Sequence, residues 1–311
     1  MFEIIGKTSF NFVGMRKYAF ALSTILIILG LVAFVAILLG KAPMGIDFTG
    51  GTMIQGDFKN PINIGDLRSA LVSNGFPEAK IQSLTTVGVE NSFLIRVKTV
   101  TEGVTAGEET TVDRIMAVIE KTFPGNKFTK DSEHTIGPAV GETLRSQATW
   151  AVLLAMGGIL LYIWLRFDFR FGVAATIATF HDVLAVLGIF WALRIEIDLL
   201  VITALLTLAG YSLTDTVVVF DRIRENLKLF RKKGDFVATV NVSINEVLSR
   251  TIMTSMTVLI VVVTLLLFGG PVLRSMALAL TIGVFIGTYS SWFVASPIVV
   301  VWESRSPKRF K

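Results

Sequence analysis

An acidic side chain stands in a long apolar segment, where a charge is costly. Asp215 lies within the apolar run 199–220. A charged side chain near the centre of a bilayer costs at least about 2.5–3.5 kcal/mol on insertion scales. Arg250 starts the next helix just before the apolar run 252–268, and Thr254 follows four residues later, which puts both on one helix face. If the two helices are neighbours, Arg250 could reach Asp215, and a change in their separation would bind and release a proton.

A second polar pair, His181 and Asp182, lies about ten residues into the run 171–193, close to mid-membrane by the helical rise. The pair could extend a hydrated proton path. It could equally serve packing, with His181 bonded to a neighbouring carbonyl or hydroxyl. For Asp215, the alternative to proton transport is a static buried ion pair. Intramembrane carboxylates are more often functional, which favours transport for Asp215.

Other chemistry finds no support in the sequence. The chain has no cysteine and only two histidines, which excludes thiolate chemistry and a multi-histidine metal site. It has no phosphate-binding Gly-x-x-x-x-Gly-Lys loop and no nucleophile elbow. We therefore expect no catalytic site, no metal and no cofactor. The net charge of +5 does not indicate nucleic acid, because the basic residues cluster beside apolar runs.

Composition and patterning predict a membrane protein with six spans. Of the 311 residues, 52% are hydrophobic and only 17% charged, and the mean hydropathy is +0.67. A helix needs about 20 apolar residues to cross the hydrocarbon core. Six runs approach or exceed this length: 18–39, 148–165, 171–193, 199–220, 252–268 and 276–301. The excess apolar content is thus located in transmembrane helices.

The basic residues predict the orientation of these spans. They are concentrated near the N-terminus, between the fourth and fifth spans, and in the tail. By the positive-inside rule, both termini are cytoplasmic. The predicted organisation is a cytoplasmic N-terminus 1–17, a first span 18–40, an extracytoplasmic domain 41–145, the other five spans in 146–303 with a cytoplasmic loop 221–250, and a cytoplasmic tail 304–311.

The segment 41–145 has the pattern of a small α+β domain. Alternating or β-rich stretches predict strands, and apolar residues at helical spacing predict two helices. The expected strands are 52–58, 81–86, 92–97 and 127–136, and the expected helices are 64–74 and 112–123, with a loop at 103–109. This order, βαββαβ, is the ferredoxin-like pattern.

Several strings resemble the SecD/SecF family of protein-export membrane proteins, within the resistance-nodulation-division superfamily. They cover nearly the whole chain in the family's order. They are Gly45–Thr52, Ile136–Gly141, Arg166–Gly172, His181–Val183, Gly210–Asn226, Ser249–Ser255 and Phe268–Pro271. The most specific string is Gly210–Asn226. The family often has Asn before the aspartate of the fourth span, where this chain has Thr214.

The resemblance implies a fold and a function. The fold would be half of a twelve-helix bundle, completed by a SecD subunit. The pair would work beside the SecYEG channel in the bacterial cytoplasmic membrane and use the proton motive force to promote preprotein export. Asp215, Arg250 and Thr254 match family positions linked to proton transport.

Two other functions are compatible with the residues. One is half of a proton-driven exporter of small molecules or lipids from the same superfamily. The roughly 105 residues outside the membrane leave little room for a drug pocket. The other is a passive scaffold in which Asp215 and Arg250 are only structural. The polar face of the fourth span must be covered by protein. The third, fifth and sixth spans of the same chain could cover it, and a partner's matching helix would complete the site, so we expect a heterodimer.

Overall fold

The computed structural model describes residues 8–86, 89–98, 110–229 and 235–306. Within these ranges, six helical spans are long and apolar enough to cross a membrane. They are α1 (Arg16–Leu38), α5 (Pro138–Arg166), α6 (Phe169–Ala192), α7 (Leu199–Leu229), α8 (Phe236–Phe268) and a last span, Val272–Arg305. The last span consists of α9 (Gly270–Ser290), the π-helical turn η1 (Ser291–Ala295) and α10 (Ser296–Arg305). The prediction of a six-span helical membrane protein is confirmed.

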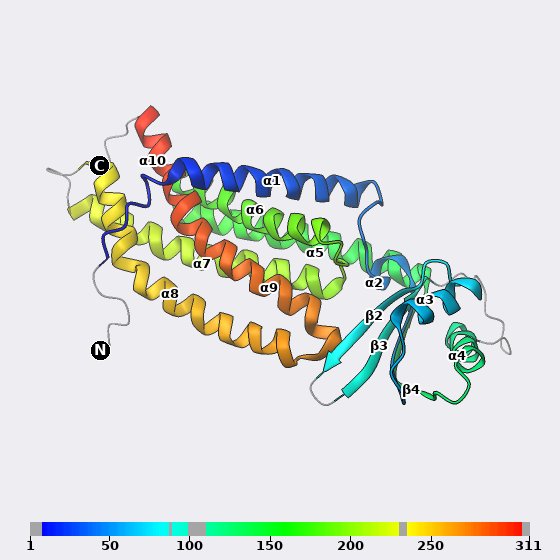
Figure 1. Ribbon diagram of the computed structural model, residues 1–311. Helices are drawn as coiled ribbons and strands as arrows, with labels where there is room; N and C mark the ends of the chain where they lie inside the picture. The colour runs from blue at the N-terminus through cyan, green and yellow to red at the C-terminus, as the bar shows by residue number, and fades with distance from the viewer. Residues whose placement is uncertain (1–7, 87–88, 99–109, 230–234, 307–311) are drawn as a thin grey trace.

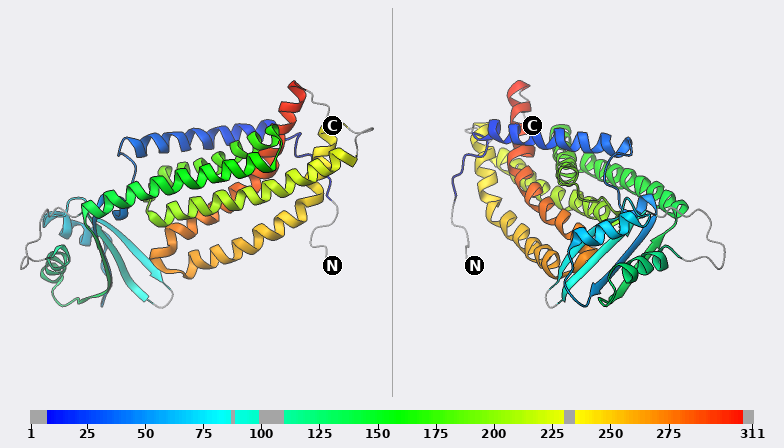
Figure 2. Two further views of the ribbon diagram at one scale, coloured as in Figure 1. Left: turned by 180° about the vertical axis from the view of Figure 1, so that it is seen from behind. Right: turned by 45° about the vertical axis from the view of Figure 1, so that its right-hand side comes forward.

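The spans form a bundle with a small sheet domain at one end and both described chain ends at the other (Figure 1). α6, α7 and the last span are mostly buried, while α1, α5 and α8 expose most of their surface. The view from behind shows α5 reaching farthest toward the sheet domain (Figure 2). The buried core of the bundle is therefore built around α6, α7 and α9.

Glycines allow the closest helix contacts. A Cβ on Gly188 of α6 would lie 2.6 Å from the backbone nitrogen of Gly30 in α1. On α9, a Cβ at Gly283 would meet Leu208 of α7 at 2.6 Å, and Gly287 lies against Ser212 of the same helix. Gly283 and Gly287 are therefore close helix-packing sites.

Three other glycines of the membrane spans have no such close contact. Gly157 and Gly158 of α5 and Gly210 of α7 have no other protein atom within 4 Å of an added Cβ among the described residues. The reason is positional, because these glycines face outward from the bundle.

The outer domain is a four-stranded antiparallel sheet with two helices. Its elements are β1 (Gly51–Phe58), α3 (Ile64–Ser73), β2 (Lys80–Thr86), β3 (Val89–Val97), α4 (Thr111–Thr122) and β4 (Phe128–Ile136). The strand order is β2-β3-β1-β4, and every neighbouring pair is antiparallel. The βαββαβ, ferredoxin-like prediction is confirmed. The expected loop 103–109 lies outside the described residues.

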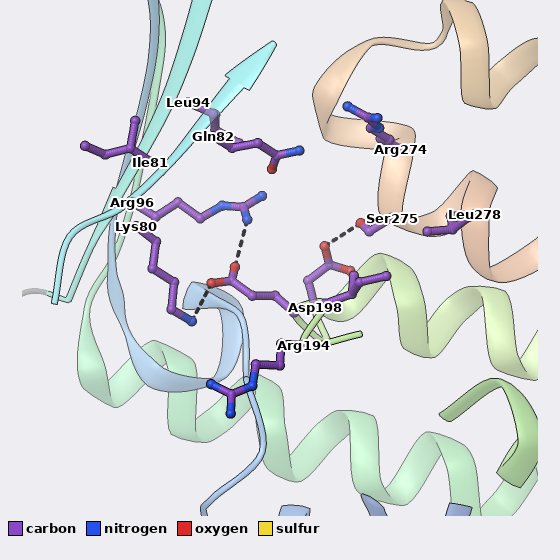
Figure 3. A pocket seen from close by; sticks show the side chains of 12 residues that line it. Lys80, Ile81, Gln82, Leu94, Arg96, Arg194, Asp198, Arg274, Ser275 and Leu278 are labelled. Carbon is purple, nitrogen blue, oxygen red and sulfur yellow. Dashed lines mark hydrogen bonds and ion pairs between the residues drawn. The ribbon is translucent and has the colours of Figure 1, made fainter. Parts of the chain in front are cut away.

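Alternation along β2 and β3 gives the sheet two different faces. Ile81 and Ile95 are buried in the core beneath α3 and α4. Their sequence neighbours Lys80, Leu94 and Arg96 point the other way, toward the outer ends of the membrane helices (Figure 3). The domain thus presents a basic face to the bundle.

Two helices are longer than their apolar runs. α5 begins at Pro138, directly after β4, and α8 begins at Phe236, sixteen residues before the apolar run 252–268. The described residues of the predicted loop 221–250 belong almost entirely to α7 and α8, so this connection is largely helical. Hydropathy cannot distinguish a polar helix that leaves the membrane from a polar loop.

Candidate functional site

Asp215 lies in the middle of α7 and is held by hydroxyl groups. Its side chain is buried, with 5% exposure. The Ser255 hydroxyl of α8 lies 3.5 Å from Asp215 Oδ2, a weak hydrogen bond. Ser255 also shares a 2.6 Å hydrogen bond with Thr288 of α9 and accepts one from the Tyr211 hydroxyl at 3.1 Å. The carboxyl group is thus in contact with a polar cluster drawn from α7, α8 and α9.

A second cluster joins α6 to α7. Asp182 is completely buried, and its Oδ1 lies 2.8 Å from Nδ1 of His181. The Ser212 hydroxyl of α7 donates to the other carboxylate oxygen. Nε2 of His181 has no hydrogen-bond partner among the described residues. The predicted pair is therefore brought into one network, with His181 bonded to its neighbour's carboxylate rather than to a carbonyl.

The two clusters share α7 as a common element. Ser212 and Asp215 are three residues apart, which is about 4.5 Å along a helix. Ser212 contacts Asp182 of α6, and Asp215 contacts Ser255 of α8. A rotation or translation of α7 therefore changes both sets of contacts at once.

Arg250 and Thr254 are on the neighbouring helix but are not bonded to Asp215 by an ion pair. Within the described chain, no nitrogen of Arg250 lies within 4.0 Å of an Asp215 oxygen, and both α8 side chains are exposed. The Thr254 hydroxyl donates to carbonyls of its own helix, those of Arg250 and Thr251. Arg250 and Thr254 are nevertheless close enough to Asp215 to interact with it electrostatically.

The sequence missed the hydroxyl partners of both acids. The sequence patterns did not single out Tyr211, Ser212, Ser255 or Thr288. A usable signal was the four-residue spacing of Tyr211 and Asp215, which places both side chains on one face of the helix. Thr288 carried no signal, because only the packing of α9 brings it there.

The opposite end of the bundle from the sheet domain is tied by ion pairs between helices. Arg166 at the end of α5 binds Asp221 of α7 at 2.7 Å, and Arg170 of α6 binds Glu303 of α10. The turn between α5 and α6 is thus bonded to both α7 and α10. Across the described ranges, no group of three or more His, Asp or Glu side chains is arranged to hold a metal ion.

Comparison with known proteins defines the family to which this chain belongs. The family model described as "Protein export membrane protein SecD/SecF, C-terminal" matches residues 115–305, more than half of the chain. The chain therefore belongs to the SecD/SecF family, as its motifs predicted.

Individual relatives are similar over nearly their whole length. The chain is 48% identical over 307 residues to protein translocase subunit SecF of Thermodesulfovibrio yellowstonii, covering 98% of this chain and 99% of that one. It is 37% identical over 292 residues to the SecF subunit of Pseudomonas aeruginosa, covering 94% and 90%.

A solved structure shares the fold. The crystal structure of SecDF, a translocon-associated membrane protein from Thermus thermophilus, matches 96% of this chain with a TM-score of 0.79 and 40% identity. This chain spans only 39% of that SecDF chain. The architecture of this protein is thus one part of a larger assembly in that relative.

Proposed function

We propose that this chain is an accessory subunit of the Sec protein translocase that, with a SecD partner, uses the proton motive force to promote preprotein export. Its membership of the SecD/SecF family and its likeness to proteins named translocase subunit SecF support the translocase role. The proton-driven part of this proposal rests on the surroundings of Asp215. No bound cofactor is needed, since the gradient itself supplies the energy.

The observation that carries the proton role is the buried Asp215 with only hydroxyl groups as hydrogen-bond partners. A carboxylate charge in low dielectric is costly without a cation, so a neutral, protonated carboxyl group is favoured while Arg250 is away. Approach of Arg250 favours the charged form and releases the proton. Alternation between the two arrangements binds a proton on one side and frees it on the other.

An exposed polar stripe on α7 supports a partner subunit. Four residues on one helix face are exposed within a membrane span: Thr203, Thr207, Gly210 and Thr214. On the neighbouring α8, Arg250 is exposed as well. A guanidinium facing lipid is costly, so a protein surface is expected to cover it. A SecD subunit fits, because in the SecDF of Thermus thermophilus the matching region is 39% of one longer chain.

We place this multi-pass protein in the bacterial cytoplasmic membrane with both termini in the cytoplasm. The basic residues at the bundle end away from the sheet domain support this orientation. The SecYEG channel and the translocating preprotein are then the expected partners of the assembly, with the outer domain on the side where the preprotein emerges.

The test is Asp215→Asn in proteoliposomes that contain the SecD partner and the SecYEG channel. Removing the titratable group should abolish the stimulation of preprotein translocation by an imposed proton gradient, while the ATP-driven stage is unchanged. Translocated preprotein and proton flux are both measured.

The matched control is Asp221→Asn, which removes an exposed carboxylate six residues along the same helix. It should retain the full response to the gradient. If Asp215→Asn also retained it, the protein would be a scaffold for its partner and not a proton-driven subunit.

A further inference from the structure

Two of the sequence motifs, Gly45–Thr52 and Ile136–Gly141, are not used by the proton site. In the structure they lie against each other at the base of the outer domain. A Cβ on Gly141, in the first turn of α5, would lie 3.0 Å from the backbone nitrogen of Gly50. Gly50 itself has a φ of 70°, which favours glycine. The two motifs thus form one close-packed junction between α5, β1 and the short helix α2 (Ile46–Thr49).

This junction is joined by backbone hydrogen bonds to the connection between α6 and α7. Met44 and Ile197 form a parallel bridge. The Ile197 N–H donates to the Pro43 carbonyl at 2.9 Å, and the Gly45 N–H donates to the Ile197 carbonyl at 2.9 Å. The connection 193–198 is therefore held by the segment that leads from α1 into the domain.

Side chains of the same segments bind the first residues of α7. Asp47 of α2 accepts a 2.9 Å hydrogen bond from the Leu199 N–H, which has no partner within the helix. Asp198 accepts from the Val201 N–H at 2.8 Å and from the Ser275 hydroxyl of α9 at 2.8 Å. A carboxylate at a helix N-terminus is also favoured by the helix dipole. The outer end of α7 is thus bonded both to the domain and to α9.

An ion-pair cluster ties the sheet to the same connection. Glu196 binds Lys80 of β2 and Arg96 of β3, each at 2.8 Å, beside a cavity of about 400 Å³ (Figure 3). The Glu196 side chain is 14% exposed and that of Arg96 22%, so this pair is largely shielded from solvent, whereas Lys80 is an exposed partner. The basic face of the sheet is thereby fixed to the residue three positions before α7 begins.

We infer that Asp47 is a positioning residue that anchors the outer end of α7 to the base of the outer domain, so that movement of this domain is transmitted to Asp215. The inference rests on the proposed function and adds the route by which the domain and the proton site are coupled. α7 is a continuous helix from Leu199, so an anchored outer end moves with Asp215 as one body. A flexible connection would absorb the movement instead.

The experiment measures proton flux and gradient-driven translocation in the same proteoliposomes of the complete assembly. In Asp47→Ala, the amount of preprotein moved per proton should fall by about fivefold or more, within the usual range of coupling between sites. Proton flux should persist, because Asp215 is untouched. Asp47→Asn keeps a side-chain oxygen for the Leu199 N–H and should restore coupling.

The control variant is Asp66→Ala, which removes an exposed carboxylate of the same domain outside the junction. In this variant the amount of preprotein moved per proton should be unchanged. Loss of flux and translocation in equal proportion in Asp47→Ala would mean a general structural defect and would overturn the inference. Asp215→Asn is run in parallel: flux that survives in that variant rejects the proposed function, whatever Asp47 does.

A second measurement uses the absence of native cysteine. Met44→Cys with Ile197→Cys places a thiol on each side of the parallel bridge, within reach of a disulfide. If the junction moves as one unit, cross-linking it leaves gradient-driven translocation unchanged, and reduction has no further effect. Loss of translocation on oxidation, recovered by reductant, would show that the junction must open and would refute transmission through it.

Discussion

Asp182 is the most buried carboxyl group in the described part of the chain, and it has two hydrogen-bonding neighbours. Asp182→Ala would leave the His181 ring and the Ser212 hydroxyl without this partner. An unsatisfied buried polar group costs about 1–3 kcal/mol, so the melting temperature of the purified chain should fall. Asp182→Asn keeps an acceptor and should cost less.

The comparison for this prediction is Asp221→Asn, whose ion pair with Arg166 is about 40% exposed and contributes little to stability. Equal melting temperatures for Asp182→Ala and Asp221→Asn would show that the buried network does not stabilise the bundle.

The acids of the site could be predicted from the sequence, but their contacts could not. A charged residue in an apolar run is rare, so Asp215 and Asp182 stand out without any structure. Serine and threonine are common in membrane helices, and only the packing of α7, α8 and α9 selects Ser255 and Thr288 as the neighbours of Asp215. The conformation of the Arg250 side chain also cannot be predicted from the sequence.

At the scale of elements, the effect of a Gly→Ala substitution on stability depends on where the glycine lies in its helix. Gly188→Ala in α6 would push a Cβ to 2.6 Å from the backbone of Gly30 in α1, and a backbone cannot swing aside. We expect a lower melting temperature and weaker attachment of α1. Thermal unfolding of the detergent-purified chain measures the first effect, and protease sensitivity of α1 measures the second.

The paired variant is Gly158→Ala in α5, where nothing lies within 4 Å of the added methyl group. Alanine favours a helix over glycine by about 1 kcal/mol, so this variant should be neutral or slightly more stable. A loss of stability in Gly158→Ala equal to that in Gly188→Ala would contradict the packing described for these two helices.

Element types were predictable and some of their ends were not. The strands and helices of the outer domain follow from alternation and helical spacing, and their observed bounds lie within a few residues of those expected. The early starts of α5 and α8 were missed, since polar helical turns beyond the membrane look like loops. The bridge between Met44 and Ile197 joins residues far apart in sequence, which no local pattern can predict.

For the whole molecule, orientation is tested with two single-cysteine variants of the cysteine-free chain. Ser132→Cys lies on the exposed face of β4, and Ser306→Cys follows α10 at the other end of the bundle. A membrane-impermeant thiol reagent added outside intact spheroplasts should label Ser132→Cys only. Ser306→Cys should react after permeabilisation. Labelling in the reverse order would invert the assigned topology.

The length of α7 has a mechanical consequence. Its 31 residues extend about 46 Å, while the hydrocarbon core is about 30 Å thick, so the helix projects well past the membrane. If the sheet domain turns the end of α7 to which it is bonded, a tilt of only about 5° displaces the other end by roughly 4 Å over that length. A small change of angle at the domain would then become a larger displacement at the far end of the helix.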